Sequence, residues 1–237
     1  MGNEAATARG LEGLRERYGL SSLAIERLEV LLEALTGDSR APTTVRDPLG
    51  VLDSHIADSL VALELDEVRA PGRVADIGAG AGLPGLALAS ALEESSFWLV
   101  ESQTSKCAFI AALGARAGIA NARVVCKRAE DWNDGAELHD LVVCRALAPQ
   151  PVVLEYASPL LRPGGRLVEW RGARSDAEEL LAAGAAEVLN LSPVAVHHVQ
   201  PFAGARDRHL HVFEKVGPTP AGFPRRTGLA RKRPLGS

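Results

Sequence analysis

A dense run of glycines near the middle of the chain is the clearest place for chemistry. An apolar stretch ends in Asp76, Gly78, Gly80 and Gly82 follow at alternate positions, and Pro84 opens an apolar helix. This order predicts a strand, a tight turn and a helix N-terminus, where proline has no N–H to lose. Glycine lets the backbone approach a ligand closely. Such turns at the carboxyl end of a first strand hold nucleoside-bearing cofactors.

Two spacings of these glycines predict different cofactors. G-x-G-x-x-G fits Gly80, Gly82 and Gly85 and would indicate a dinucleotide. D-x-G-x-G-x-G runs from Asp76 to Gly82 and places a carboxylate on the strand, where it would face the cationic methionyl end of S-adenosylmethionine. Because a carboxylate repels a pyrophosphate, we expect the sulfonium cofactor. A glycine-rich turn without any ligand is the plainer alternative.

A second carboxylate supports a nucleoside site. Residues 96–101 read as the next strand, and Glu101 ends it about 20 residues after the glycines. At that position a carboxylate accepts hydrogen bonds from both ribose hydroxyls. NAD and S-adenosylmethionine sites share this feature, so Glu101 predicts a ribose without identifying the cofactor.

The elements that must position these residues alternate along the chain. Strands are predicted at 73–77, 96–101, 122–126, 139–144 and 164–170, and helices at 85–93, 104–117, 150–161 and 175–184. This alternation predicts a mostly parallel sheet with helices on both faces. Residues 194–199 and 210–215 have no helix between them and predict a terminal hairpin with one antiparallel strand. That ending is typical of S-adenosylmethionine-dependent methyltransferases and not of dinucleotide dehydrogenases.

The fold class is therefore α/β, a doubly wound, Rossmann-like class I methyltransferase with a mostly parallel seven-stranded sheet. Before the sheet, helices are predicted at 11–18, 21–36 and about 54–65, the last capped near Asp53 or Ser54. We expect three parts: an N-terminal helical cap (1–70), the methyltransferase domain (71–217) and a basic C-terminal tail (218–237).

The bulk composition excludes several classes of protein. With 237 residues, 46% hydrophobic and 24% charged, the chain predicts a soluble globular protein with one core. No apolar run is long enough for a membrane span and the N-terminus has no secretory signal, so a cytoplasmic protein without membrane contact is expected. Cys107, Cys126 and Cys144 predict buried, reduced thiols, and neither they nor the adjacent His197 and His198 have metal-ligand spacing.

The charge is unevenly distributed. The net charge is −4, yet the last 16 residues hold five cations and no acid, which leaves −9 for the rest. An acidic body repels a polyanion unless its basic groups gather on one face. The tail, with Arg225 and Arg226, is expected to be either a flexible arm that neutralises phosphates or a loop that folds over the cofactor mouth.

Further segments give a resemblance to a known family. They are Arg46-Asp47-Pro48, His55–Ser59, Asp76–Gly85, Glu101–Lys106, Arg128-Ala129-Glu130, Cys144-Arg145-Ala146, Arg162–Gly165, Asp207–Leu210 and the tail from Phe223 to Pro234. In this order the chain resembles the bacterial ribosomal small subunit methyltransferase G family, also called glucose-inhibited division protein B. The resemblance implies methyl transfer from S-adenosylmethionine to N7 of one guanosine of 16S rRNA near the decoding region, leaving S-adenosylhomocysteine. It implies 16S rRNA or the small subunit as partner, and no metal.

The resemblance also assigns roles to residues. The cofactor contacts it implies fall on Gly78, Leu83, Ala129, Glu130 and Arg145, in addition to Asp76, Gly80 and Glu101 from the loop itself. The RNA contacts it implies are Lys106, Arg128, Arg171 and Arg208. The family often has Lys-Gly after the fifth strand, where this chain has Arg171-Gly172. Arginine keeps the charge but changes the donor geometry.

The implied reaction needs no general base, because guanine N7 carries a lone pair and no proton. Catalysis can come from alignment of donor carbon and N7 about 3 Å apart, with Arg145 as a positioning group beside both. His55 and Asp58 lie three residues apart on one helical face and form either a surface cluster or, by the resemblance, a border of the active site. Cys144 would be a nucleophile only for cytosine C5 chemistry, which no neighbouring residue supports.

Two alternatives stay open. A small-molecule methyltransferase of the same fold would favour an aromatic substrate lid, yet aromatic residues make up only 4% of the chain. A non-catalytic rRNA-binding assembly factor would keep the cofactor pocket without transferring a methyl group, and an assay of methyl transfer would separate it from an enzyme.

Overall fold

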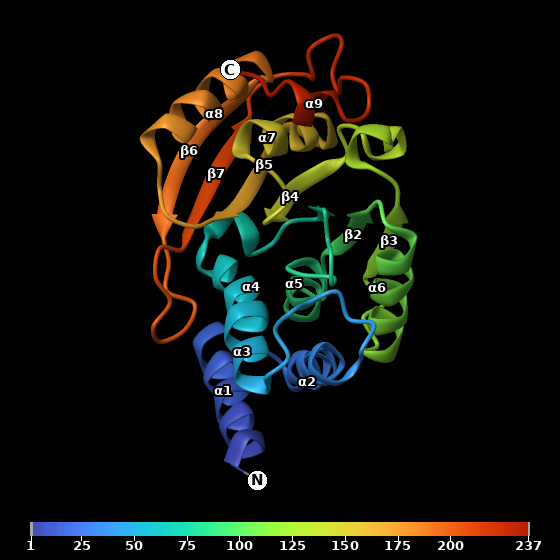
Figure 1. Cartoon of the computed structure of the whole chain (residues 1–237), viewed down its shortest axis with the longest axis vertical. Helices are drawn as coiled ribbons and strands as arrows, with labels where there is room; N and C mark the ends of the chain where they lie inside the picture. Colours follow the sequence, from blue (N-terminus) through green and yellow to red (C-terminus); the bar gives the residue numbers. More distant parts are fainter. Residues whose placement is uncertain (1, 237) are drawn as a thin grey trace.

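The computed structural model describes residues 2–236, so Met1 and Ser237, the ends of the predicted cap and tail, lie outside it. One seven-stranded sheet forms its centre, in the order β3-β2-β1-β4-β5-β7-β6 (Figure 1). The strands are β1 (Arg73–Ile77), β2 (Ser96–Glu101), β3 (Ala122–Cys126), β4 (His139–Arg145), β5 (Leu161–Arg171), β6 (Leu191–His198) and β7 (His209–Lys215). Strands β1 to β5 are parallel, and β7 is antiparallel to both β5 and β6. The predicted sheet and terminal hairpin are confirmed.

Alternate residues of the central strands face two hydrophobic cores. On β4, Leu141 and Val143 belong to one core, and Val142 and Cys144 belong to the other. This follows from the two-residue period of a strand. Because both faces are covered, the buried strands are mainly apolar, with buried exceptions that include Asp76, Glu169 and His211.

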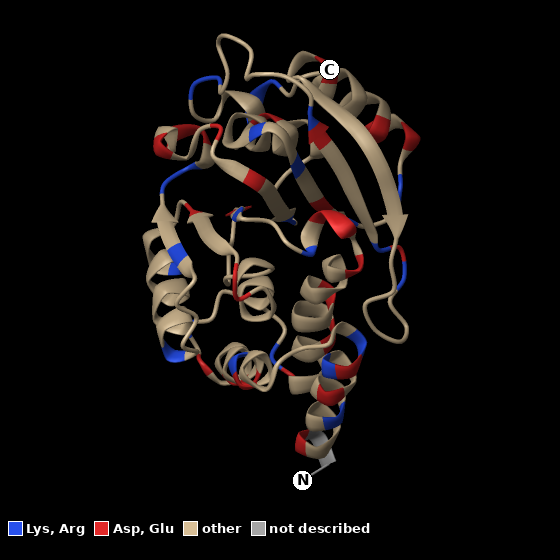
Figure 2. Cartoon of the chain, turned by 180° about the vertical axis from the view of Figure 1, so that it is seen from behind, with Lys and Arg blue, Asp and Glu red and all other residues tan. Residues whose placement is uncertain are grey.

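The first core lies under the N-terminal helices, α1 (Gly2–Tyr18) and α2 (Ser22–Gly37), with α5 (Gly85–Ala91) and α6 (Thr104–Arg116). The second lies under α7 (Gln150–Ala157), α8 (Asp176–Val188) and α9 (Leu229–Lys232). The N-terminal helices lie at one end of the molecule and the C-terminal segment at the other (Figure 1). Charges of both signs are interspersed along α1 (Figure 2).

The helix predicted at 54–65 begins earlier, and its predicted start was wrong. Asp47 is the N-cap, its carboxylate accepting from the Gly50 N–H at 2.6 Å, and Pro48 occupies the first position. Asp-Pro is a strong start signal that outweighs the turn-forming residues around it. The segment continues as α3 (Pro48–Val51), the π-helix η1 (Leu52–Ala57), α4 (Asp58–Leu60) and the 3₁₀ turns η2 (Val61–Glu64) and η3 (Asp66–Val68).

The cysteine prediction was correct at two positions out of three. Cys107 and Cys144 are buried, and burial raises the pKa of both thiols, that of Cys107 to about 12. Cys126 is exposed, because it ends β3 at the edge of the sheet. Within residues 2–236, no helix is both long and apolar enough to cross a membrane.

Candidate functional site

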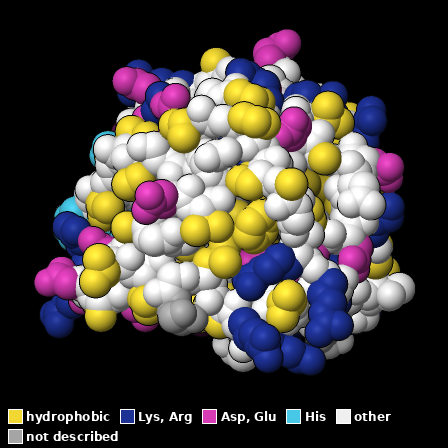
Figure 3. Space-filling view, turned by 90° about the horizontal axis from the view of Figure 1, so that it is seen from above, with side chains coloured by type: hydrophobic (Ala, Val, Ile, Leu, Met, Phe, Trp, Pro, Cys, Tyr) yellow, Lys and Arg dark blue, Asp and Glu magenta, His cyan; other side chains and the backbone are white. Residues whose placement is uncertain are grey.

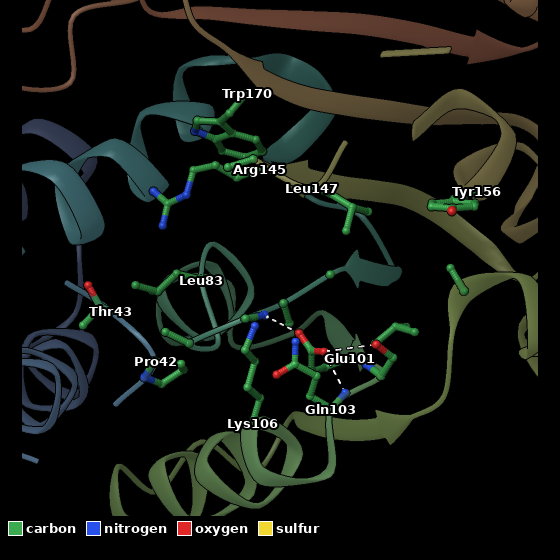
Figure 4. Close-up of a pocket in the computed structure, with 18 of the residues that line it drawn as sticks. Pro42, Thr43, Leu83, Glu101, Gln103, Lys106, Arg145, Leu147, Tyr156 and Trp170 are labelled. Carbon is green, nitrogen blue, oxygen red and sulfur yellow. Dashed lines mark hydrogen bonds between the residues drawn. The ribbon is translucent and has the colours of Figure 1, made fainter. Parts of the chain in front are cut away.

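A cavity of about 740 Å³ opens where the N-terminal helices face the carboxyl ends of the parallel strands. Its walls come from distant parts of the sequence, including Pro42, Leu83, Glu101 and Trp170 (Figure 4). Twelve of the residues singled out from the sequence line it: His55, Gly78, Gly80, Leu83, Glu101, Lys106, Arg128, Ala129, Glu130, Arg145, Arg171 and Arg208. The structure therefore brings together most of the predicted site, while Asp76, Arg225 and Arg226 are not among the lining residues.

The glycine turn leaves β1 and bends sharply over the end of β2. Gly78 and Ala79 donate their N–H groups to the Val100 carbonyl at 2.8 and 3.1 Å. Gly78 has φ +73°, and a Cβ there would stand 2.5 Å from the Leu147 side chain. Only glycine meets both conditions without strain. The turn thus places bare backbone along the cavity wall.

Glu101 is held rigidly by backbone donors. One carboxylate oxygen accepts from the N–H groups of Ser102 and Gln103 at 2.7 and 2.9 Å, and the other accepts from Gly80 at 3.1 Å (Figure 4). These bonds fix the carboxylate at the cavity wall. Each carboxylate oxygen has two lone pairs, so acceptor capacity remains on Oε2 for a ribose hydroxyl.

Asp76 has a different position from the one expected. Its carboxylate is buried behind the turn, where Oδ2 accepts from the Gly85 N–H at 2.8 Å, and it does not line the cavity. Burial raises its pKa to about 7, against the opposing effect of the Gly85 hydrogen bond. The other oxygen, Oδ1, has no hydrogen-bond partner among the described residues. Through its hydrogen bond with Gly85, Asp76 therefore stabilises the glycine turn and the first residue of α5 from the buried side.

The loop after β3 is clamped by the C-terminal segment. Ala129 and Glu130 belong to a 3₁₀ turn, η4 (Ala129–Asp131), and the Glu130 carboxylate accepts from the Gly228 N–H at 3.0 Å. Arg231 also lines the cavity and donates to the Leu147 carbonyl at 3.1 Å. Of the two expectations for the tail, the loop that folds over the cavity mouth agrees with these contacts.

The two tail arginines have unlike surroundings. Arg225 donates through Nε and Nη2 to the two carboxylate oxygens of Glu155, whose side chain is 1% exposed. Arg226 is exposed. Seen from above, cationic side chains cluster on the face that carries this segment (Figure 3), whose exposed cations are Arg226, Arg231, Lys232 and Arg233. Arg225 anchors the segment, Arg231 borders the cavity, and Arg226, Lys232 and Arg233 face solvent.

Arg145 extends from the end of β4 toward the N-terminal helices. Its Nη1 donates to Asp58 Oδ2 at 2.8 Å and approaches the His55 carbonyl at 3.4 Å. The His55 ring contacts the Thr43 hydroxyl at 2.7 Å, and burial together with Arg145 lowers its pKa. Of the two interpretations of His55 and Asp58, the site border agrees with this geometry.

The predicted basic residues differ in how far they are already paired. Lys106 and Arg128 lie at the rim, half-buried and exposed respectively. Arg171 is paired with Glu178 at 2.7 Å and with the buried Glu169 at 3.3 Å. Burial raises the pKa of Glu169 to about 7, although Arg171 and a hydrogen bond from Gln150 oppose this. The side chain of Arg171 is therefore occupied by ion pairs within the fold, whereas Lys106 and Arg128 at the rim are more available to bind an anion.

Several lining residues were not foreseen. They are Pro42, Thr43, Ser54, Gln103, Lys127, Leu147, Tyr156, Trp170 and Arg231. Most come from loops or helix faces that only the tertiary fold brings to the cavity. Asp58, which the sequence had grouped with His55, also lines the cavity.

These residues fit a nucleoside with a cationic substituent. Glu101 keeps acceptor capacity on Oε2 for a hydroxyl, Leu83 and Leu147 supply apolar surface, and the loop at 129–130 offers backbone polar groups at the wall. The unpartnered Asp76 Oδ1 and its raised pKa show an acid that a nearby cation would stabilise in the charged form. The volume of about 740 Å³ lies within the range of ligand pockets.

Comparison with known proteins gives a consistent result. The family model for rRNA small subunit methyltransferase G matches residues 25–211. The ribosomal RNA small subunit methyltransferase G of Syntrophomonas wolfei is 41% identical over 211 residues, covering 87% of this chain and 96% of that protein. The protein of the same name from Rubrobacter xylanophilus is 37% identical over 233 residues, covering 95% of this chain and 87% of that one.

Solved structures agree on the fold. The mitomycin 7-O-methyltransferase MmcR superimposes with a TM-score of 0.57 at 14% identity, covering 72% of this chain and 55% of that one. A SAM dependent methyltransferase from Aquifex aeolicus gives 0.54 at 15% identity, covering 71% and 93%. At these identities the likeness concerns the class I methyltransferase architecture alone.

Proposed function

The chain belongs to the rRNA small subunit methyltransferase G family, and from this premise we propose that it methylates N7 of one guanosine of 16S rRNA near the decoding region. The observation that carries the proposal is the cavity itself. It joins a wall suited to a nucleoside, around Glu101 and the glycine turn, to an arginine-rich wall under the N-terminal helices. A donor and a nucleotide can therefore meet inside one enclosure.

S-adenosylmethionine is the cofactor that fits the first wall, and when bound it supplies an electrophilic methyl group on a sulfonium. Glu101 would hold the ribose, and Leu83 with Ala129 and Glu130 would enclose the base. Asp76, held by Gly85, would act from behind the turn, stabilising the cationic end through the local field. The chain's contribution is binding and orientation.

The second wall would orient the target base. Guanine N7 has a free lone pair, so no residue needs to remove a proton. Arg145 donates to Asp58 through Nη1, which leaves its other N–H groups for the nucleotide. Alignment of the reacting atoms in an enclosed site contributes several kcal/mol to the barrier reduction, about 7 at the lower end of measured effective molarities.

RNA contacts outside the cavity are proposed at the rim. Lys106 and Arg128 flank the cofactor wall, Arg208 the opposite wall, and Arg226 lies on the exposed tail. Because the body of the chain is acidic, these cations provide the route for a phosphate backbone. We keep the division into cap (1–70), methyltransferase domain (71–217) and tail (218–237) as a proposal, with the reaction in the cytoplasm on rRNA or the small subunit.

The test is to map N7-methylguanosine in 16S rRNA. Small subunits from cells lacking this protein are incubated with S-adenosylmethionine and the purified chain, and the methylated position is located by chemical cleavage at N7-methylguanosine. We expect one modified guanosine near the decoding region. The Arg145→Ala variant serves as the control and should leave that guanosine unmodified while still folded. Methylation at another atom, or none on any ribosomal substrate, would overturn the proposal.

A further inference from the structure

One buried carboxylate lies between two arginines of the cavity wall. Asp58 Oδ2 accepts from Arg145 Nη1 at 2.8 Å, and Asp58 Oδ1 lies 3.3 Å from Arg208 Nε. The Asp58 side chain is 8% exposed, against 15% for Arg145 and 40% for Arg208. The arginines come from β4 and from the segment before β7, so Asp58 joins two separate parts of the sheet edge.

The backbone around Asp58 supports the same arrangement. Trp170 donates its indole N–H to the Asp58 carbonyl at 2.7 Å, and the His55 carbonyl lies 3.4 Å from Arg145 Nη1. Asp58 directly follows the π-helix η1, where the chain is wound more widely than in an α-helix. Short π-helical segments inside helices are frequent at functional sites, because they redirect side chains and carbonyls.

The charges at this point do not balance. Two guanidinium groups meet one carboxylate, which leaves one positive charge at the cavity wall. Arg145 donates a hydrogen bond to Asp58 through Nη1, whereas Arg208 forms an ion pair with the carboxylate oxygen Oδ1, which has no hydrogen-bond partner among the described residues. Both arginines have further N–H groups, and all three residues line the cavity. Such a pair of oriented forks suits an oxygen acceptor of a nucleotide, either a phosphate or the guanine O6 beside N7.

We propose that Asp58 is a positioning residue, which orients Arg145 and Arg208 toward the oxygen acceptors of the target nucleotide. This inference rests on the proposed function. Asp58 acts through the arginines and touches neither cofactor nor reacting atoms. Without its charge the two guanidinium groups repel each other and lose their common direction, so substrate alignment should suffer more than cofactor binding.

The chain provides a matched control for a merely structural role. Glu67 is also a mostly buried acid of the N-terminal segment that pairs with a strand arginine, Arg166, at 2.6 Å. Neither Glu67 nor Arg166 lines the cavity. Glu67→Gln therefore removes one ionic link between the cap and the sheet and leaves the cavity intact.

The experiment compares full-length wild type, Asp58→Asn, Asp58→Glu and Glu67→Gln. Thermal unfolding, S-adenosylhomocysteine affinity by calorimetry, and kcat and KM for methyl transfer to undermethylated small subunits are measured. For Asp58→Asn we expect kcat/KM to fall about 100-fold, mainly through kcat, with cofactor affinity changed less than about threefold. Asp58→Glu restores the negative charge on a side chain that is one methylene longer. Its kcat/KM should therefore lie between the values of wild type and Asp58→Asn. Glu67→Gln should stay within about threefold of wild type.

The outcomes are decisive in each direction. Asp58→Asn no slower than Glu67→Gln, or Asp58→Glu as active as wild type, overturns the inference and leaves the proposed function standing. If Asp58→Asn does not fold, Asp58→Glu carries the test by the same criterion. Wild type that fails to methylate small subunits under any condition removes the proposed function, and this inference with it.

Discussion

At the scale of single residues, the site depends on how two carboxylates are held. Glu101 receives three backbone N–H donors and faces the cavity, whereas Asp76 receives one and is buried behind the turn. Both carboxylates were expected at the cofactor, and only Glu101 lies on the cavity wall. Glu101 ends a strand, so its side chain reaches the sheet edge. Asp76 is followed by a turn that folds back over it.

Replacing Glu101 tests the nucleoside wall. In Glu101→Gln, the amide NH₂ would oppose at least one backbone donor, and the acceptor capacity for a ribose is halved. We expect the affinity for S-adenosylhomocysteine to fall by a factor of about 30 or more, which is about 2 kcal/mol. Calorimetry measures this without RNA. Asp66→Asn, at an exposed acid that pairs with Arg69 away from the cavity, is the control and should bind as wild type does.

Another residue-scale prediction concerns the buried Glu169, which contacts Gln150 and Arg171. Its pKa is raised to about 7 in the folded chain, so between about pH 4.5 and pH 7 the folded state holds a proton that the unfolded state has lost. Stability due to this group is therefore present at low pH and lost as pH rises through this window. Compared with Glu169→Gln, wild type should lose up to about 3 kcal/mol of unfolding free energy from pH 4.5 to 7.

The measurement is urea unfolding of both proteins at several pH values. The difference between them isolates Glu169 from His211, whose pKa is lowered to about 4 by burial and which acts in the opposite direction. A difference that does not change with pH would mean that Glu169 is ionised in the folded chain throughout.

At the scale of elements, the C-terminal segment has two separable roles. Arg225 pairs with the buried Glu155 and holds the segment against α7, while Arg226 is exposed. The sequence alone offered no reason to assign different roles to Arg225 and Arg226, which are adjacent in one basic run. Their difference arises from tertiary structure, since only one of them finds a buried acid on a distant helix.

Replacing Arg225 should therefore affect stability, and replacing Arg226 should affect RNA binding. Arg225→Gln leaves Glu155 buried without its partner and should lower the unfolding free energy by about 3 kcal/mol. Arg226→Gln should leave stability within about 0.5 kcal/mol of wild type. It should weaken RNA binding and reduce the slope of log affinity against log salt by about 1. Equal stability of the two variants would contradict the anchoring role, and an unchanged salt slope would remove Arg226 from the RNA contacts.

How far the sequence predicted the elements depends on the kind of signal. All seven strands were placed to within a few residues, because apolar runs between glycines and charges have a clear period. The start of the helix at Pro48 was missed, because the cap was expected at Asp53 or Ser54 and not at Asp47. The π-helix at Leu52–Ala57 has no recognised sequence signal, and neither Thr43 nor Tyr156 could be brought to the cavity without the fold.

At the scale of the whole molecule, the cavity lies between the N-terminal helices and the carboxyl ends of the parallel strands. The N-terminal helices share a core with one sheet face, and the C-terminal segment closes the opposite side through Glu130 and Glu155. The catalytic walls therefore belong to no single segment. This explains why residues from position 42 to position 231 line one space in an acidic molecule.

The position of β7 inside the sheet has a consequence for synthesis. β6 is paired through β7 and not directly with β5, so residues 191–198 have no neighbouring strand until residue 215 has left the ribosome. The Gly228 contact with the loop after β3 can form only later still. A nascent chain therefore completes the enclosure of its active site last, after the nucleoside wall at Glu101 has long been made.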